Sequence, residues 1–157
     1  MLTIEAEVDE QIATLGEPQA GESRKTLTGL PYFEYRRILQ NLLSETLKSM
    51  HHFQEVVKKR LDGDHEADPD AAIFEIAGAL ELMGDQKTSD LAYLLQQQTQ
   101  SLLKNVYSED ALPADKLEHF TDAVAALELY LAAHRDQQEH GHFVQVLKSS
   151  LKQLGAE

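Results

Sequence analysis

The chain of 157 residues contains no cysteine. Disulfide bonds and thiolate metal sites are therefore excluded, and the absence fits a cytoplasmic location, which is the one we expect. The chain also lacks any apolar run near the ~20 residues that a membrane-spanning helix needs, so we expect no membrane insertion. Residues 1–7 carry acidic rather than basic side chains, which argues against a secretory signal peptide.

Basic side chains are scarce as well. The chain has 14 Lys and Arg against 27 Asp and Glu, which gives a formal net charge of -13. Nucleic acid and anionic membranes bind to basic patches, so we expect neither of them as a partner. A protein with some basic surface is a more suitable partner. With 42% hydrophobic and 26% charged residues, the composition is otherwise that of a soluble globular domain.

Apolar residues recur at three- and four-residue steps over most of the chain, and this spacing predicts helices. No segment has the character of a strand. Residues 1–29 are predicted to form a short amphipathic helix, over residues 2–15, followed by a linker with glycine, proline and charge but no period. Residues 30–157 then form one helical domain. We expect an all-α fold, an antiparallel four-helix bundle with an extra N-terminal helix and a short C-terminal helix.

Proline, glycine and aspartate mark the ends of the first two bundle helices. Pro31 opens a long helix that runs to Gly63. Pro69 opens the second helix, with Asp68 as its N-cap, and Gly84 ends it. The connection after this helix is short, so it predicts an antiparallel hairpin.

The later helices are bounded in the same way. Asp85 caps the third helix, Pro113 opens the fourth, and Gly141 separates the fourth from the fifth. Each helix carries one apolar stripe that should face a shared core. In chain order the stripe residues are Leu39, Leu43, Thr46, Met50, Phe53, Val57 and Leu61; Ile73, Ile76, Ala77, Leu80 and Met83; Leu91, Leu94, Leu95, Leu102 and Val106; Leu117, Phe120, Val124, Leu127 and Leu131; and Phe143, Val146, Leu147, Leu151 and Leu154.

The second helix has a glycine in its middle, at Gly78, where glycine is about 1 kcal/mol less favourable than alanine. Chains tolerate such a glycine where something must approach the backbone closely. The segment resembles the phosphohistidine helix of histidine-phosphotransfer (HPt) domains, which reads His-x-x-Lys-Gly with a second glycine six residues on. Gly78 and Gly84 match the glycines, while Phe74 stands at the histidine and Ala77 at the lysine. The resemblance implies an HPt-type bundle that has lost the phospho-accepting group.

Residues 121–131 resemble a helix with the pattern ADA(I/V)xSLEYYLE, found in one group of HPt-like domains. These are the degenerate HPt-like domains of the chemotaxis-type kinases, and of their inactive relatives, that control type IV pili and twitching motility. Residues 151–155 also resemble the LxxLG end of those domains, and the likeness covers residues 30–155. The chain departs from the pattern at Ala126, where serine is expected, and at Leu129, where the first of two tyrosines is expected. Several domains of that group lack the phospho-accepting histidine.

The resemblance implies a non-catalytic docking or scaffolding domain of a bacterial chemosensory system of the type IV pilus kind. Its partner would be a response-regulator receiver or a polar scaffold protein, recognised through a helix face. At 100° per residue, Phe74 and Leu82 lie off the core stripe. The alternative is a structural helical spacer or a dimerisation domain that forms a homodimer; Gly78 would then let helices pack closely, with Phe74 at the edge of the core. The expected partner-binding face consists of Phe74, Glu75, Ala77, Gly78, Glu81 and Leu82.

No other segment suggests catalysis, a cofactor or a metal. The chain has no nucleophile elbow, phosphate loop or dinucleotide fingerprint, so we expect no enzyme and no cofactor. The acidic loop 62–70 alternates carboxylates as a calcium loop does, but Ala67 and Ile73 stand where that loop needs glycine and glutamate. His140 and His142 have no third ligand in the sequence. The remaining histidines, His134 among them, lack a following Lys-Gly and are expected to be solvated.

Overall fold

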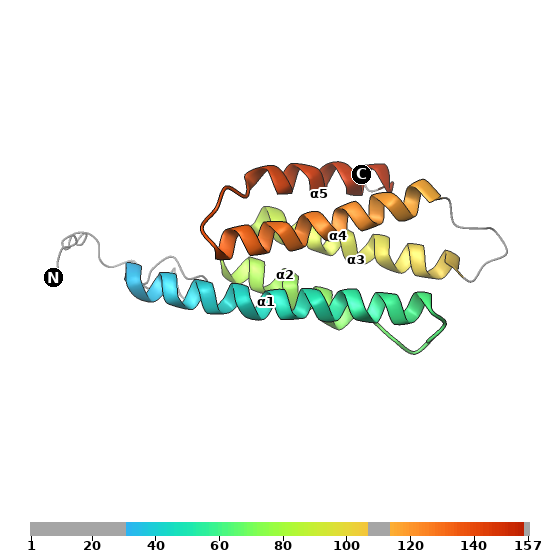
Figure 1. Ribbon diagram of the computed structural model, residues 1–157, viewed down its shortest axis with the longest axis horizontal. Helices are drawn as coiled ribbons and strands as arrows, with labels where there is room; N and C mark the ends of the chain where they lie inside the picture. Colours follow the sequence, from blue (N-terminus) through green and yellow to red (C-terminus); the bar gives the residue numbers. More distant parts are fainter. Residues whose placement is uncertain (1–30, 107–113, 156–157) are drawn as a thin grey trace.

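The computed structural model describes residues 31–106 and 114–155 (Figure 1). These residues form helices and no strand, so the prediction of an all-α fold is confirmed. The helix expected over residues 2–15 and the linker after it lie outside the described residues. The helices are α1 (Tyr32–Leu61), α2 (Asp70–Leu82), α3 (Gln86–Val106), α4 (Ala114–Arg135) and α5 (Gly141–Gln153).

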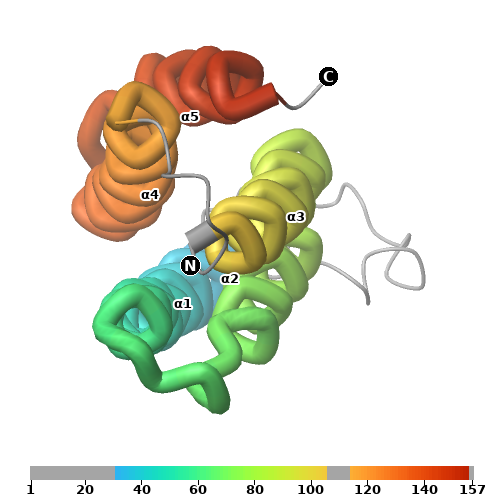
Figure 2. The backbone as a smooth tube through the Cα atoms, turned by 90° about the vertical axis from the view of Figure 1, so that its right-hand side faces the viewer, coloured from blue at the N-terminus to red at the C-terminus, as the bar shows by residue number. Residues whose placement is uncertain are grey.

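The five helices run alternately up and down and enclose one core (Figure 1). Seen from the end, α1 packs beside α2 and α4, and α2 packs beside α3 (Figure 2). The ring is closed by α5, which lies on α4 and also contacts α3. The C-terminal helix was expected to be an appendage of a four-helix bundle. It is instead part of the wall, because Val144, Leu147 and Leu151 are buried in the common core.

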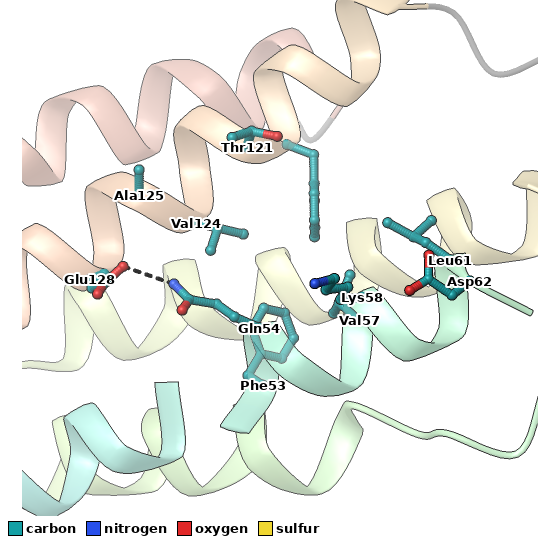
Figure 3. Close-up of a pocket in the computed structure, with 11 residues that line it drawn as sticks. Phe53, Gln54, Val57, Lys58, Leu61, Asp62, Thr121, Val124, Ala125 and Glu128 are labelled. Carbon is teal, nitrogen blue, oxygen red and sulfur yellow. Dashed lines mark hydrogen bonds between the residues drawn. The ribbon is translucent and has the colours of Figure 1, made fainter. Parts of the chain in front are cut away.

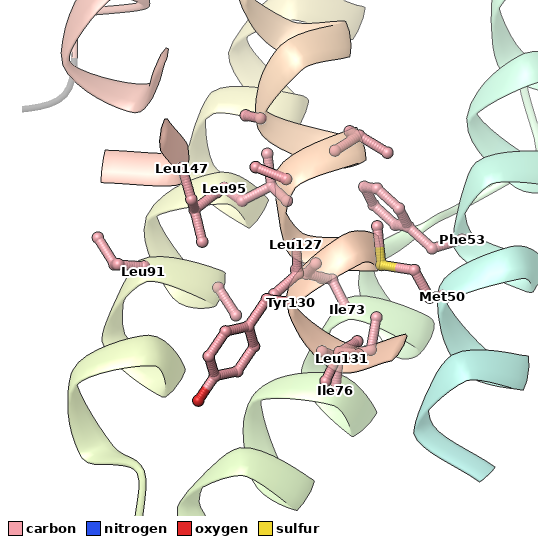
Figure 4. Close-up of a cluster of buried hydrophobic side chains, with 14 of the residues drawn as sticks. Met50, Phe53, Ile73, Ile76, Leu91, Leu95, Leu127, Tyr130, Leu131 and Leu147 are labelled. Carbon is pink, nitrogen blue, oxygen red and sulfur yellow. The ribbon is translucent and has the colours of Figure 1, made fainter. Parts of the chain in front are cut away.

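The core is formed mainly by the predicted stripes (Figure 4). Leu61, Leu117 and Val146 are exceptions, since all three are exposed. Leu61 and Leu117 lie in terminal turns, where fewer neighbouring helices are available to cover them. In α5 the buried stripe passes through Val144 instead of Val146. The side chain of Val106 is outside the described residues.

The helix boundaries follow the predicted caps at two places. The Oδ1 atom of Asp68 accepts a hydrogen bond of 3.0 Å from the Asp70 N–H, and Pro69 already has helical backbone angles. The Oδ1 atom of Asp85 accepts a hydrogen bond of 3.2 Å from the Thr88 N–H, which caps α3. Between these helices, Gly84 has φ +86°, a conformation that favours glycine.

The end of α4 was predicted wrongly. The helix ends at Arg135, well before Gly141, which is the first residue of α5. The chain turns at Gln137, which has φ +60°, and the Gln138 N–H donates a hydrogen bond of 2.8 Å to the Ala133 carbonyl oxygen. A left-handed residue followed by such a bond is a common helix ending, but glycine usually occupies it. The sequence carried no signal for a turn at a glutamine.

No helix within the described part of the chain is both long enough and apolar enough to cross a bilayer.

The burial pattern of α4 gives a test of the fold. Leu127 is fully buried, whereas Leu129, two residues along the same helix, is 49% exposed. Leu127→Ala should lower the free energy of unfolding by about 2–5 kcal/mol, because it leaves a cavity in the core. Leu129→Ala is the matched control and should change it by less than about 0.5 kcal/mol. Urea denaturation of both variants checks this, and equal losses would contradict the orientation of α4.

Candidate functional site

The solvent side of α2 is fixed by what the helix buries. Ile73, Ile76 and Leu80 point into the core and are essentially inaccessible. The opposite side carries two large apolar side chains that are exposed, Phe74 at 45% and Leu82 at 39%. Together with the exposed residues around them they form a surface that we call the α2 face. It consists of Phe74, Glu75, Gly78, Glu81 and Leu82.

Ala77 was assigned both to the core stripe and to this surface; its place in the core is confirmed, and its place on the surface is wrong. Its side chain is 0% exposed and lies in the core. Its carbonyl oxygen accepts a hydrogen bond of 2.8 Å from the Ser89 hydroxyl on α3. A small residue is suited to this contact between α2 and α3, and a longer side chain would have to enter a packed core.

Gly78 lies in the middle of the α2 face. A Cβ atom added to it would have no described atom within 4 Å, apart from its own helix backbone and chain neighbours. The alternative that Gly78 allows two helices of this domain to pack closely is therefore wrong for the described residues. The glycine still makes the helix less stable than alanine would. Nothing in the described internal packing accounts for it.

Tyr93 on α3 extends the apolar surface beyond α2. Its ring lies beside that of Phe74, with centroids 5.9 Å apart and an interplanar angle of 44°. Its side chain is 37% exposed. Tyr93 was not among the residues predicted for the partner-binding face, although a large aromatic residue off the leucine stripe of α3 was a usable signal.

The charge on α2 is entirely negative. The helix contains Asp70, Glu75 and Glu81 and no Lys, Arg or His. Asp70 is engaged inside the domain, where its Oδ1 atom accepts hydrogen bonds from the amides of Gln96 (3.1 Å) and Gln100 (2.7 Å). The Oε1 atom of Glu75 accepts a hydrogen bond of 2.8 Å from the Ser49 hydroxyl on α1. The α2 face therefore combines an apolar centre with exposed carboxylates.

A second surface is an apolar groove between α1 and α4 (Figure 3). Its volume is about 380 Å³. Phe53 and Val57 on α1 and Val124 on α4 are among the residues that line it. Glu128 lies at one end, where it accepts a hydrogen bond of 2.8 Å from the Gln54 amide and pairs with His51 at 3.0 Å. This groove was not predicted from the sequence, because its apolar residues have the spacing of ordinary core positions.

A cluster of polar aromatic side chains joins the ends of three helices. The Tyr130 hydroxyl donates a hydrogen bond to Asp85, and burial, followed by this hydrogen bond, raises the pKa of Tyr130. The rings of His134 and His140 are stacked, with centroids 4.5 Å apart and an interplanar angle of 11°. The expectation that His134 is solvated is wrong, because its Nδ1 atom is buried and has no hydrogen-bond partner among the residues that the structure describes.

These polar groups do not form a metal site. Within residues 31–106 and 114–155, no three His, Cys, Asp or Glu side chains are arranged to hold a metal ion. His142 does not join His140; its ring lies against Phe143, with centroids 4.0 Å apart. In the acidic loop, Asp64 accepts a hydrogen bond from the Glu66 N–H at 3.1 Å, so this carboxylate is used in a turn.

Comparison with protein-family models matches residues 34–151, most of the chain, to the FimL C-terminal domain. The chain belongs to this family. Membership agrees with the resemblance to type IV pilus chemosensory proteins, and it indicates a pilus-associated chemosensory role. Searches of curated proteins and of solved structures found no significant match. The family model covers all of α2, α3 and α4 and most of α1 and α5 of this FimL-type domain, including the whole of the α2 face.

The open space around Gly78 in this FimL-type domain leads to a stability prediction. Gly78→Ala should raise the free energy of unfolding by about 0.5–1 kcal/mol, because alanine favours the helix and its methyl group meets no obstacle. Gly84→Ala is the matched control. It should lower stability by about 1 kcal/mol or more, since φ at Gly84 is +86°. Thermal and urea denaturation measure both changes, and a destabilised Gly78→Ala protein would contradict the geometry of the α2 face.

The stacked histidines lead to a pH prediction. Burial lowers the pKa of His134, the positive charges of His140 and Arg36 lower it further, and Asp85 opposes them. The folded domain therefore binds a proton at His134 more weakly than the unfolded chain, where histidine titrates near pH ~6.5. The contribution of neutral His134 is complete above about pH 6.5 and is lost as the pH falls through the lowered folded pKa.

His134→Gln should flatten the fall in stability below about pH 6.5. His52→Gln, at an exposed position on α1, is the control and should keep the slope of the parent protein. Urea denaturation at a series of pH values between about 7.5 and 5.5 measures the slopes. Identical slopes in His134→Gln and the parent would show that His134 does not carry the effect.

Proposed function

We propose that this domain is a non-catalytic docking domain of a pilus-associated chemosensory system. In this proposal it derives from an HPt-type bundle and has lost the phospho-accepting histidine, with Phe74 at the corresponding position. Its partner is a response-regulator receiver or a polar scaffold protein. Family membership supports the assignment to this signalling system. The exposure of the α2 face supports its role as the docking surface.

The environment of Gly78 is the observation that carries the proposal. A mid-helix glycine at which an added Cβ atom would meet no described neighbour lies between two exposed apolar side chains, Phe74 and Leu82. A glycine lets another backbone or a large side chain approach the helix closely. Because the described residues of the domain do not use this approach, an external partner is the most economical reason for it.

The residues of the α2 face also argue against phosphotransfer. The phenyl ring of Phe74 has no nitrogen that could accept a phosphoryl group. Ala77, at the position of the lysine in the HPt motif, is buried and uncharged. Glu75 and Glu81 add negative charge beside the site, and this would oppose an incoming phosphoryl group. We therefore propose binding without catalysis and without a cofactor.

The alternative function is a structural spacer or a homodimerisation domain. A symmetric dimer through the α2 face would place Glu75 and Glu81 of one copy against the same residues of the other. Like charges in contact oppose association, so this face is better suited to a different protein than to a second copy. A spacer role would leave the exposure of Phe74, Leu82 and Tyr93 without a purpose.

The double substitution Phe74→Ala with Leu82→Ala tests the docking function. Binding to receiver and scaffold proteins of the same pilus chemosensory system should fall at least about tenfold, because the apolar centre is lost. Stability should change by less than about 1 kcal/mol, since both side chains are exposed. Leu129→Ala, which removes an exposed leucine from α4, is the control and should bind as the parent does. Calorimetric titration and urea denaturation give the two readouts; unchanged binding, or a large loss of stability, would favour the spacer function.

A further inference from the structure

The arrangement of apolar and charged groups on the α2 face restricts what can bind there. Phe74, Gly78 and Leu82 follow one another at four-residue steps, so they form a strip along the helix. At about 100° per residue, Glu81 lies about 60° to one side of Gly78 and Glu75 about 60° to the other. The apolar strip is therefore bordered by a carboxylate on each side.

The centre of the strip has no side chain of its own. Phe74 and Leu82 project from the helix one turn before and one turn after Gly78, which has no side chain. No described atom fills the space above the glycine. A large apolar side chain of a partner helix fits such a position, because helix surfaces interlock by placing a side chain between neighbours on the facing helix.

The carboxylates beside the strip determine which residues suit the two sides of the partner helix's apolar stripe. Glu75 and Glu81 are exposed, and no basic side chain on α2 neutralises either of them. A bound helix with acidic or neutral borders would offer no opposite charge to these carboxylates at the edge of an apolar contact. A helix with Lys or Arg on both sides of its apolar stripe pairs with both.

We propose that the α2 face binds an amphipathic helix of a partner protein whose apolar stripe is bordered on both sides by Lys or Arg. One apolar side chain of that helix sits over Gly78, between Phe74 and Leu82. The inference rests on the docking function proposed above and adds the chemistry of the partner. Residues 1–15 of this chain do not fit the description, because they contain four acidic residues and no basic one.

Three synthetic peptides test the proposal on the full 157-residue chain. Each is about 18 residues long, a length at which a helix can persist, and carries the same leucine stripe. The residues beside the stripe are Lys in the first peptide, Gln in the second and Glu in the third. Backbone amide shifts in NMR spectra locate the binding site, and titration gives the dissociation constant.

The Lys peptide should shift the amides of Gly78 and Tyr93, and it should bind most tightly of the three. Glu75→Gln with Glu81→Gln should weaken it about two- to twentyfold at low salt, the range expected for two exposed charge pairs. The control, Glu118→Gln with Asp122→Asn, removes two exposed carboxylates from α4 and should have little effect. Raising the ionic strength from about 0.05 to about 0.5 M should reduce the difference between the Lys and Gln peptides.

Several results would overturn the proposal. If the variants of α2 and of α4 weakened binding of the Lys peptide equally, the peptide would be attracted only by the net negative charge of the domain. Equal binding of the Lys and Gln peptides at the α2 face would refute the basic borders but leave the docking function standing. Shifts confined to the groove near Val124, or to an interface between two copies of the chain, would refute this site. The docking function is tested separately, by the binding of the natural partners to Phe74→Ala with Leu82→Ala and by the stability of that variant.

Discussion

The rotation of α2 about its own axis is the constraint on which the candidate site depends. Burial of Ile73, Ile76 and Leu80 against the other helices leaves one orientation for this short helix. Each of these side chains contributes about 1.5–3 kcal/mol through burial, so turning the helix by one residue position would cost far more than the α2 face could return. The exposure of Phe74 and Leu82 is therefore a consequence of the core.

The sequence was sufficient for the helices, most of their core stripes and the rotation of α2. These features are local, because a helix with one apolar side must turn that side inward. The errors lie at residues whose spacing along the helix is that of a core residue but whose place in the bundle is not in the core, or the reverse. Leu117 has the spacing of a core residue but lies at a helix end, and Val144 rather than Val146 faces inward because α5 docks on α4 and α3. The turn at Gln137 was missed because glutamine rarely takes a positive φ.

In the candidate site, too, the features of a single helix were predicted and those that depend on two helices were missed. Five of the six residues assigned to the partner-binding face are exposed together, since they share one side of one helix. Ala77 was misassigned because a motif alignment, rather than its position on the helix, placed it on that face. The contact of Tyr93 with Phe74 and the groove beside Glu128 each require residues from two helices. Such combinations depend on the lateral packing of helices, which periodicity within one helix does not specify.

The helix pairs of the domain differ in how far apart in sequence their contacting residues lie. The α2–α3 and α4–α5 pairs are hairpins joined by residues 83–85 and 136–140, so each can form from contacts close in sequence. The hydrogen bond from Gln54 to Glu128 joins residues 74 positions apart. Bringing them together costs more loop-closure entropy than forming either hairpin. The contact between α1 and α4 is thus a long-range one, in contrast to the contacts within the two hairpins. Phe74 and Tyr93 belong to one local hairpin, so the apolar centre of the α2 face is built from a contact close in sequence.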